Sequence, residues 1–275
     1  MEHIRQALDR VAEAEPNGVG SRSSKEDASR SPSNRGPAAT RIDGTQPATI
    51  ELRHKQLEAE RIVAHDITDP RSKSFDMLRT QILQSMDLKE WQVLAVTSPT
   101  PGCGKTFTSI NLAMSIARQR EKSVLLIDMD LQKPQIASRL GIRPAHGLVS
   151  MLEGKASLAE ATARVRISNT QFSVLPCERS VTQSSDWMAS SAMATFLRSL
   201  RQNDRSQIII LDLPPVLTGD DVLLVLPHID CVLFVAAAGL STASEFRECN
   251  KHLQSTAVVR IALNKSSAAS SPHYY

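Results

Sequence analysis

The chain has 275 residues, 41% of them hydrophobic, so it can bury one α/β core of about 200 residues and leave a long arm outside it. The formal net charge of +3 is small and both signs are interspersed, which favours neither nucleic-acid binding nor an electrostatic membrane anchor. The four cysteines form no CxxC pair and are too sparse for a disulfide framework, so we expect a reducing, cytoplasmic environment.

Residues 1–57 are expected to be a largely disordered N-terminal arm. A short helix over residues 3–15 would place Ile4, Leu8 and Val11 on one face, but a helix of that length is marginal by itself. Residues 17–48 are rich in Ser, Arg, Pro and Gly, a composition that cannot bury enough surface to order itself.

Neither a signal peptide nor a membrane-spanning segment is expected. The N-terminus is charged throughout, and the most apolar stretch, 221–240, is interrupted by Pro227, His228 and Asp230. Any membrane association is therefore expected to come through a partner.

Residues 58–265 are predicted to form one domain in which helices and strands alternate. Phe75, Leu78, Ile82 and Met86 mark one face of a helix that enters it. Strands are predicted at 91–97, 123–128, 172–176, 207–212, 231–237 and 258–263, and helices at 104–119, 185–202 and 241–255. Apolar strands that alternate with helices indicate a mostly parallel sheet with helices on both faces.

Residues 98–106, Ser-Pro-Thr-Pro-Gly-Cys-Gly-Lys-Thr, lie between an apolar strand and a helix, where a phosphate-binding loop belongs. Glycines let the backbone approach a phosphate chain, Lys105 can reach the β- and γ-phosphates, and the Thr106 hydroxyl can ligate Mg²⁺. Pro99 stands where the full pattern has glycine, but the Gly-Lys-Thr core is intact. The loop predicts a nucleotide site.

Three aspartates are predicted at strand ends. Asp128 and Asp130 follow one apolar run, and Asp212 ends another that Pro214 and Pro215 stop sharply. Each could instead be a helix cap or a turn residue. Because ligands bind at the carboxyl ends of parallel strands, the three together favour a Mg²⁺ site beside the phosphate chain.

Two further features are ambiguous from sequence. Asp220 and Asp221 precede an apolar run, and we favour a helix N-cap with a first-turn charge. Cys103 lies at a helix N-terminus, which could make it oxidisable, although a small residue tolerated in the loop is the simpler interpretation.

Together, several ordered motifs resemble the bacterial tyrosine kinases (BY-kinases) of capsule and exopolysaccharide assembly, most closely their free-standing cytoplasmic form. The resemblance covers residues 62–265 and implies the P-loop ATPase fold of the partitioning and division-site ATPases. The motifs are Val-Thr-Ser-Pro-Thr-Pro-Gly-Cys-Gly-Lys-Thr (96–106), Leu-Leu-Ile-Asp-Met-Asp-Leu-Gln-Lys-Pro (125–134), Gly-Leu-Val-Ser-Met-Leu-Glu-Gly (147–154), Val-Leu-Pro (174–176) and Leu-Asp-Leu-Pro-Pro-Val-Leu-Thr-Gly-Asp-Asp (211–221).

The resemblance implies a role for each matching residue. Lys105 would act on the phosphates of ATP, and Asp128 would activate the tyrosine hydroxyl. Asp130 would help to place Mg²⁺ together with Thr106 and Asp212. Nucleotide contacts are implied at Pro101, Gly102, Cys103, Gly104, Lys105, Thr106, Phe107 and Asn264. The phosphoacceptors would be Tyr274 and Tyr275, the only tyrosines, on a flexible tail (266–275) of a neighbouring subunit.

A cellular role is implied in the same way. The chain would be an ATP-dependent protein-tyrosine autokinase that regulates the synthesis and export of exopolysaccharide or capsular polysaccharide. It would be cytoplasmic and peripheral at the inner face of the membrane, held by the cytoplasmic segment of a membrane polysaccharide chain-length (co-polymerase) protein. Self-association through the tail and ATP site is implied, a cognate tyrosine phosphatase is a possible partner, and no nucleic acid is expected.

The chain departs from the family pattern in places. Its oligomerisation helix usually carries Glu, Arg and Arg at three-residue spacing, and the matching positions are Lys73, Asp76 and Arg79. Ring assembly in the usual form is therefore not expected. Gln132 and Ala237 stand where arginines are common.

Two other functions stay open. A partitioning-type ATPase switch without kinase activity would need a signature lysine at the position of Thr100, which this chain lacks. A nucleotide-binding scaffold with weak catalysis could regulate the chain-length protein by binding alone. GTP use is disfavoured, because Asn264-Lys265 is followed by serines and not by the aspartate that reads guanine.

Overall fold

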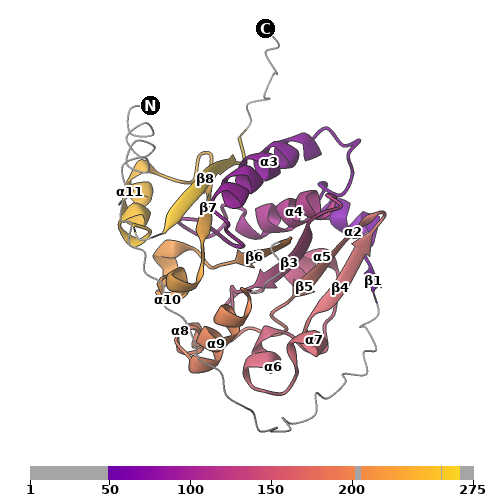
Figure 1. Ribbon diagram of the computed structural model, residues 1–275. Coiled ribbons are helices and arrows are strands. Elements are labelled where there is room, and N and C mark those ends of the chain that lie inside the picture. The colour runs from indigo at the N-terminus through magenta and orange to yellow at the C-terminus, as the bar shows by residue number, and fades with distance from the viewer. Residues whose placement is uncertain (1–48, 202–205, 255, 267–275) are drawn as a thin grey trace, which may run out of the picture. The chain divides into compact units, whose positions relative to one another are not determined.

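The computed structural model describes residues 49–201, 206–254 and 256–266. In this part, one sheet of eight strands has the order β1-β4-β5-β3-β6-β2-β7-β8 (Figure 1). All neighbouring strands are parallel except β4 and β5, which are antiparallel. The strands are β1 (Ile50–Glu51), β2 (Val93–Thr97), β3 (Ser123–Asp128), β4 (Ala163–Ile167), β5 (Thr170–Leu175), β6 (Gln207–Asp212), β7 (Cys231–Ala237) and β8 (Ala257–Asn264).

Helices connect the strands and cover both faces of the sheet. They are α2 (His54–Ala59), α3 (Ser72–Leu88), α4 (Lys105–Ala117), α5 (Ile136–Leu140), α6 (Leu148–Leu152), α7 (Leu158–Ala161), α8 (Ser184–Met188), α9 (Ser191–Ser199), α10 (Asp221–Val225) and α11 (Ala243–His252), with 3-10 turns η1 (Val216–Thr218) and η2 (Leu226–His228). Among the described residues, no helix is both long and apolar enough to cross a membrane.

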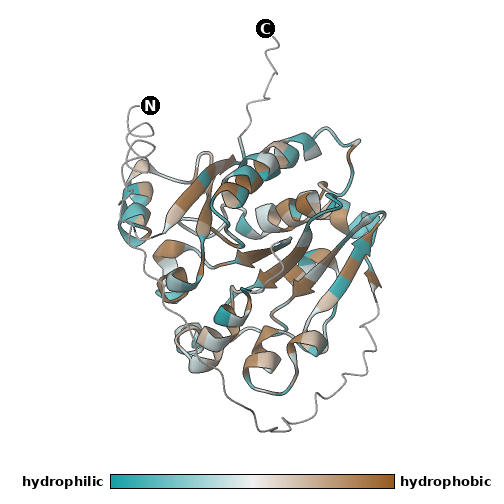
Figure 2. Ribbon diagram, in the orientation of Figure 1, coloured by the Kyte–Doolittle hydropathy of each residue, from teal (hydrophilic) through white to brown (hydrophobic). Residues whose placement is uncertain are grey.

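The core forms two apolar layers, one on each face of the sheet. Alternate residues of a strand point to opposite faces, so Leu94 and Val96 of β2 pack with α3 and α4, whereas Val93 and Ala95 pack in the layer of α6 to α11. Every residue of β2 and β7 is buried, as expected for strands covered on both faces. Figure 2 shows β7, at the place labelled in Figure 1, as hydrophobic.

The predicted fold class is confirmed: strands 123–128, 207–212 and 231–237 coincide with β3, β6 and β7. The prediction of one continuous helix over residues 185–202 is wrong, because this segment forms two helices, α8 and α9. Ser190 causes the break, since its extended backbone and its side chain, which accepts a hydrogen bond from the Met193 N–H (3.1 Å), begin a new helix.

The domain begins earlier than residue 58, so the predicted arm boundary is corrected. β1 and α2 belong to the same sheet and core: the Leu52 N–H donates to the Arg166 carbonyl (2.7 Å), and Leu57 is fully buried. The segment lacks a long apolar run, so its sequence did not reveal it. The predicted helix at 3–15 and the tail with Tyr274 and Tyr275 lie outside the described residues.

Candidate active site

The predicted phosphate loop connects β2 to α4, whose first-turn backbone N–H groups point into it. Gly102 and Gly104 have φ angles of +83° and +96°, in the left-handed region that favours glycine. A Cβ atom on Gly104 would lie 2.1 Å from Nδ2 of Asn264. Gly104 is therefore required both by its backbone and by the close approach of Asn264.

Asn264 is the last residue of β8 and fixes the loop from the other side. Its Nδ2 donates a hydrogen bond to the Cys103 carbonyl (2.9 Å), and its Oδ1 accepts one from the Lys265 N–H (2.8 Å). The prediction that Asn264 belongs to the nucleotide site agrees with this position beside the loop.

A cavity of about 380 Å³ opens on the loop. It is lined by Gly102, Gly104, Lys105, Thr106, Phe107, Asn264, Lys265, Glu60, Arg61, Gln135 and Arg139. Arg139 forms an ion pair with Glu60 (2.7 Å), so the segment after α2 and helix α5 are joined at the rim. The sequence analysis missed Glu60, Arg61 and Arg139, because only the fold brings these distant segments together.

The segment after α2 is held in place by a buried amide. Oδ1 of Asn111, on α4, accepts hydrogen bonds from the N–H groups of Val63 (2.8 Å) and Ala64 (3.0 Å). Arg61 has a φ angle of +57°, a conformation uncommon for a residue with a side chain. These contacts place Glu60 and Arg61 beside the phosphate loop.

The three predicted aspartates do meet at the carboxyl edge of the sheet. Asp128 lies opposite Asp212 in the register of β3 and β6, and Val96 of β2 lies opposite Asp212 on its other side. The Nζ atom of Lys105 is 3.4 Å from Oδ2 of Asp130. Asp128 and Asp212 are fully buried, and Lys105 and Asp130 are less than 10% exposed, so these charges interact with little screening by water.

Only one of the two carboxylate oxygens of Asp212 has a hydrogen-bond partner in the described part of the chain. Its Oδ1 accepts a hydrogen bond from the Ser109 hydroxyl (3.0 Å), while its Oδ2 is buried without a hydrogen-bond partner among the described residues. Burial raises the pKa of Asp212 to about 6, against the opposing effects of the Lys105 charge and the hydroxyls of Thr106 and Ser109. The sequence analysis missed Ser109, although its spacing of four residues from Lys105 puts it on the same face of α4.

These residues fit a Mg²⁺ ion that arrives with a nucleotide. In the described part of the chain, no group of three His, Cys, Asp or Glu side chains could hold a metal alone. Mg²⁺ usually takes only one or two carboxylates and completes its shell with phosphate oxygens and water. The unpartnered oxygen of Asp212 and the hydroxyl of Thr106, at the start of α4, suit that chemistry, whereas Asp130 is paired with Lys105.

Asp128 holds the loop that carries Asp130. Its Oδ2 accepts hydrogen bonds from the N–H groups of Gln135 (3.0 Å) and Ile136 (2.9 Å), and its Oδ1 accepts one from the Asp130 N–H (3.3 Å). Burial first, and then the Asp212 charge, raises the pKa of Asp128 well above its usual range. Asp128 is therefore both a structural cap and a carboxyl group with unusual proton affinity.

Asp220 is the N-cap residue of α10 and Asp221 is in its first turn, as predicted, but their side chains are used elsewhere. Asp220 makes no capping hydrogen bond to α10; instead it accepts one from the Ser185 hydroxyl (2.5 Å), and Asp221 accepts one from the Ser184 hydroxyl (2.6 Å). Ser184 in turn accepts a hydrogen bond from the Gln132 amide (2.7 Å). The pair therefore ties α10 to α8 and to the loop after β3.

Two predicted loop contacts do not reach the cavity with their side chains. Pro101 and Cys103 are not among the residues that line it. Cys103 is fully buried beneath the loop, with its Sγ 3.5 Å from the Ser241 hydroxyl oxygen. This position agrees with the interpretation of Cys103 as a small residue tolerated in the loop.

Two of the positions matched to the oligomerisation helix, Asp76 and Arg79 of α3, form hydrogen bonds within the domain. Asp76 accepts hydrogen bonds from the Ser115 hydroxyl (2.6 Å), from Nη2 of Arg118 (3.0 Å) and from Nη1 of Arg79 (3.2 Å). The same Nη1 of Arg79 also donates to the Ser115 carbonyl (3.1 Å). The charges of Asp76 and Arg79 therefore join α3 to α4.

Known proteins resemble the chain over this whole region. A family model described as an AAA domain matches residues 91–233. A putative tyrosine-protein kinase EpsB from Ralstonia nicotianae is 30% identical over 213 residues, which are 78% of this chain and 27% of that protein. The chain thus spans about a quarter of the length of this curated relative.

Solved structures show the same likeness. The VpsO kinase domain is 30% identical, with a TM-score of 0.63, over 72% of this chain and 97% of that one. The kinase domain of the Escherichia coli tyrosine kinase ETK is 28% identical, with a TM-score of 0.63, over 74% of this chain and 80% of that one. With its P-loop NTPase fold, this chain belongs to the AAA domain family and, within it, to the bacterial tyrosine kinases.

Proposed function

We propose that this chain is a Mg-ATP-dependent protein-tyrosine autokinase that phosphorylates Tyr274 and Tyr275 on the tail of a neighbouring copy. The observation that carries the proposal is the meeting of Lys105, the Asp128–Asp130 pair and the half-satisfied Asp212 beside one phosphate loop. Phosphoryl transfer depends on positioning and charge neutralisation, which this arrangement supplies.

Each residue has a defined task in the proposal. The loop N–H groups and Lys105 hold the phosphates, Thr106 and Asp212 hold Mg²⁺, and Asp130 orients Lys105. The bound Mg²⁺ would neutralise charge on the β- and γ-phosphates. The tyrosine hydroxyl, with a pKa of about 10, gives its proton to Asp128 as its oxygen bonds to the γ-phosphorus and the bond to the β-phosphate oxygen breaks, leaving ADP.

The raised pKa of Asp128 supports its role as proton acceptor, because a base acts best when its pKa lies near the working pH. Its complete burial means that the Asp130 loop must move before a tyrosine reaches it. The three backbone N–H groups that Asp128 holds are the contacts that such a movement would break.

We further propose that the kinase regulates the synthesis and export of exopolysaccharide or capsular polysaccharide, at the inner face of the membrane. Its partner there would be the cytoplasmic segment of a membrane chain-length protein, and a tyrosine phosphatase would reverse the modification. Membership of the bacterial tyrosine kinases supports this context.

The deciding experiment is intact-mass and peptide analysis of the purified chain after incubation with Mg-ATP. We expect phosphate on the tail, none in the Lys105→Met variant, and none in the variant that combines Tyr274→Phe with Tyr275→Phe. ATP hydrolysis without phosphotyrosine, even with the partner's cytoplasmic segment added, would favour a non-kinase switch; nucleotide binding without turnover would favour a scaffold.

A further inference from the structure

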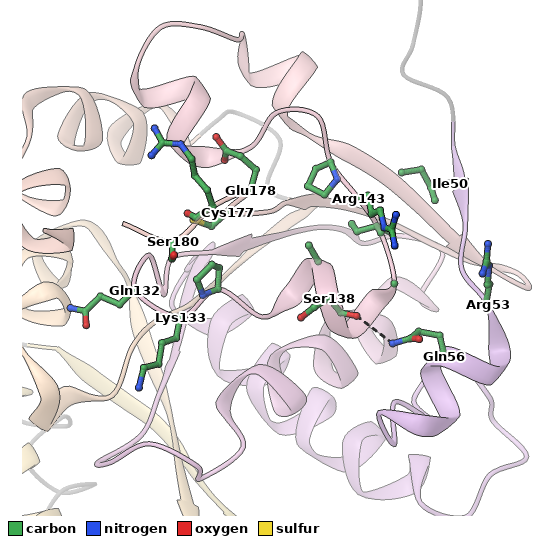
Figure 3. Close-up of a pocket in the computed structure, with 16 residues that line it drawn as sticks. Ile50, Arg53, Gln56, Gln132, Lys133, Ser138, Arg143, Cys177, Glu178 and Ser180 are labelled. Carbon is green, nitrogen blue, oxygen red and sulfur yellow. Dashed lines mark hydrogen bonds between the residues drawn. The ribbon is translucent and has the colours of Figure 1, made fainter. Parts of the chain in front are cut away.

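A second cavity, of about 1320 Å³, lies next to the active-site loop and is lined by 16 residues (Figure 3). We call it the basic groove, after its four cationic side chains: Arg53, Lys133, Arg143 and Arg179. Its lining comes from β1 and the start of α2, from residues 132–144 and from residues 177–180. The lining contains one acidic residue, Glu178.

Most of the positive charge in the basic groove is unpaired. Arg179 forms an ion pair with Glu153 (2.6 Å), but the side chains of Arg53, Lys133 and Arg143 make no hydrogen bond or ion pair with any residue that the structure describes. Glu178 forms no ion pair with them in the described part of the chain; its carboxylate accepts hydrogen bonds from the Ser150 N–H (2.7 Å) and hydroxyl (2.6 Å) and from the Val149 N–H (3.2 Å).

The basic groove shares a wall with the active site. The Lys133 N–H donates to Oδ1 of Asp130 (3.1 Å), and the Val181 N–H donates to the Leu131 carbonyl (2.9 Å). The loop that carries Asp130 is thus bonded to the far wall of the groove. Figure 3 places Lys133 on one side of the groove and Arg143 and Arg53 on the other, so an anion between them would lie beside the loop that carries Asp130.

We propose that the basic groove binds the tail after a tyrosine has been phosphorylated; the ligand is a phosphotyrosine peptide, and the proposal rests on the proposed kinase function. Residues 266–275 contain no Asp or Glu, so the unmodified tail offers no acidic side chain to the three cations. Phosphorylation adds a charge of about −1.5 to −2 and three strong acceptor oxygens, which arginines bind well.

The size of the basic groove favours a peptide over a small anion. Sites for small molecules usually enclose roughly 300–1,000 Å³, and the groove is larger than that range. A phosphorylated tail bound there would remain beside the active site while its second tyrosine is presented. Because Tyr274 and Tyr275 are adjacent, retention would raise the share of doubly phosphorylated tails above the share expected from two independent encounters.

The test measures binding, not catalysis. A fluorescent peptide with the sequence of residues 266–275, capped at both ends and carrying phosphate on Tyr274, is titrated with the full-length Lys105→Met variant, and anisotropy is recorded. We expect the phosphopeptide to bind about tenfold or more tightly than the unphosphorylated peptide, because the phosphate gains charge-assisted hydrogen bonds.

Substitutions then locate the binding site. Combining Arg53→Gln with Arg143→Gln is expected to weaken phosphopeptide binding at least about tenfold. The control is Arg247→Gln, which removes an exposed arginine from α11, away from the basic groove, and is expected to leave binding unchanged. Thermal melting of each variant shows that it is folded.

Three results would overturn the inference. The two peptides could bind with equal affinity, or the groove substitutions could leave the affinity for the phosphopeptide unchanged. Alternatively, inorganic phosphate could displace the phosphopeptide with an inhibition constant equal to the dissociation constant of the phosphopeptide. The peptide is phosphorylated in advance and the protein cannot transfer phosphate. A failure of the kinase proposal is therefore seen in the mass-spectrometric experiment, and a failure of the groove is seen here.

Discussion

At the scale of single residues, Asp212 serves binding at the expense of folding. Its burial with one unpartnered oxygen raises its pKa, which means that the folded chain holds the charged form less readily than water does. A cation beside that oxygen would remove the penalty. The same atom therefore destabilises the empty domain and gives the nucleotide-bound domain part of its stability.

Replacing Asp212 with Asn is expected to show both effects. The pKa of about 6 in the folded chain lies above the ordinary value of 3.8, so the wild-type carboxyl stabilises the folded state fully below about pH 3.8, and this contribution is lost as the pH rises to about 6. Without ligand at pH 7.5, Asp212→Asn should therefore melt a few degrees higher than the wild type, since 1 kcal/mol corresponds to roughly 2–4 °C in a domain of this size.

Melting curves between pH 5 and pH 8, with and without Mg-ATP, check this prediction. We expect the variant to lose the stabilisation that Mg-ATP gives the wild type. Parallel pH profiles for the two proteins, or an intact response to Mg-ATP, would show that Asp212 neither titrates in this range nor holds the metal.

Gly104 allows a second residue-scale prediction. Gly104→Ala should cost about 1 kcal/mol through its left-handed backbone, and it should also displace Asn264 from the Cys103 carbonyl. Gly154→Ala is the matched control, because Gly154 has a φ angle of +71° but open space around it. Both variants should lose stability through the left-handed backbone, Gly104→Ala the more because it also loses the Asn264 contact, and only Gly104→Ala should lose affinity for a fluorescent ATP analogue. If the two variants bound the ATP analogue with equal affinity, the loop geometry at Gly104 would not contribute to nucleotide binding.

Asp128 can be tested for chemistry apart from structure. Asn caps a helix about as well as Asp, so Asp128→Asn should keep the contacts to Gln135 and Ile136 and retain nucleotide affinity. Without a carboxylate it should lose tail phosphorylation. Quantitative phosphotyrosine analysis beside nucleotide titration decides the matter: unaltered turnover would remove Asp128 from the role of base.

At the scale of elements, the contact between α3 and α4 combines apolar packing with a network of charges. Asp76 lies between Arg79 and Arg118, and its pKa is low because the hydrogen bonds from Ser115 and Arg118 outweigh the effect of its burial. The position at which the resemblance leads us to expect arginine thus holds an acid here. A single substitution cannot restore the usual pattern, because the two neighbouring arginines require an anion between them.

This arrangement predicts an ordered pair of effects on stability. Asp76→Asn should lower the free energy of unfolding by about 1–3 kcal/mol, through the loss of charge-assisted hydrogen bonds. Asp76→Arg should lower it further, because three cations would then meet. Denaturant unfolding of the three proteins measures the order, and equal stability of wild type and Asp76→Arg would show that the network is not structural.

At the scale of the whole molecule, the parts predicted correctly from sequence are those with a local signal. The strands β2, β3, β6 and β7 are continuous apolar runs, and the aspartates at the ends of β3 and β6 were therefore placed correctly. The strand β4 alternates Arg164 and Arg166 with apolar residues, which is itself a strand pattern, but its five residues contain no continuous apolar run and the sequence analysis missed it. The two-residue strand β1 exists only because β4 pairs with it, so no local pattern could predict it.

The residues of the site also fall into two groups, those that a local motif predicts and those that only the fold brings together. Gly102, Gly104, Lys105 and Thr106 are contiguous and follow from one motif. Glu60 and Arg139 line the same cavity but are 79 positions apart, and the cations of the basic groove come from separate segments. Proximity of this kind depends on how helices pack on the sheet, which sequence periodicity does not specify.

The bond between Asn264 and the phosphate loop has a consequence for the root of the tail. The residues that bear the proposed phosphoacceptors follow Asn264 and Lys265 directly, and both of these line the nucleotide cavity. Lys265 has a φ angle of +58°, so the chain changes direction there. A nucleotide that shifts the Asn264 amide would therefore also shift Lys265, which couples the occupancy of the phosphate loop to the position of the tail's first residues.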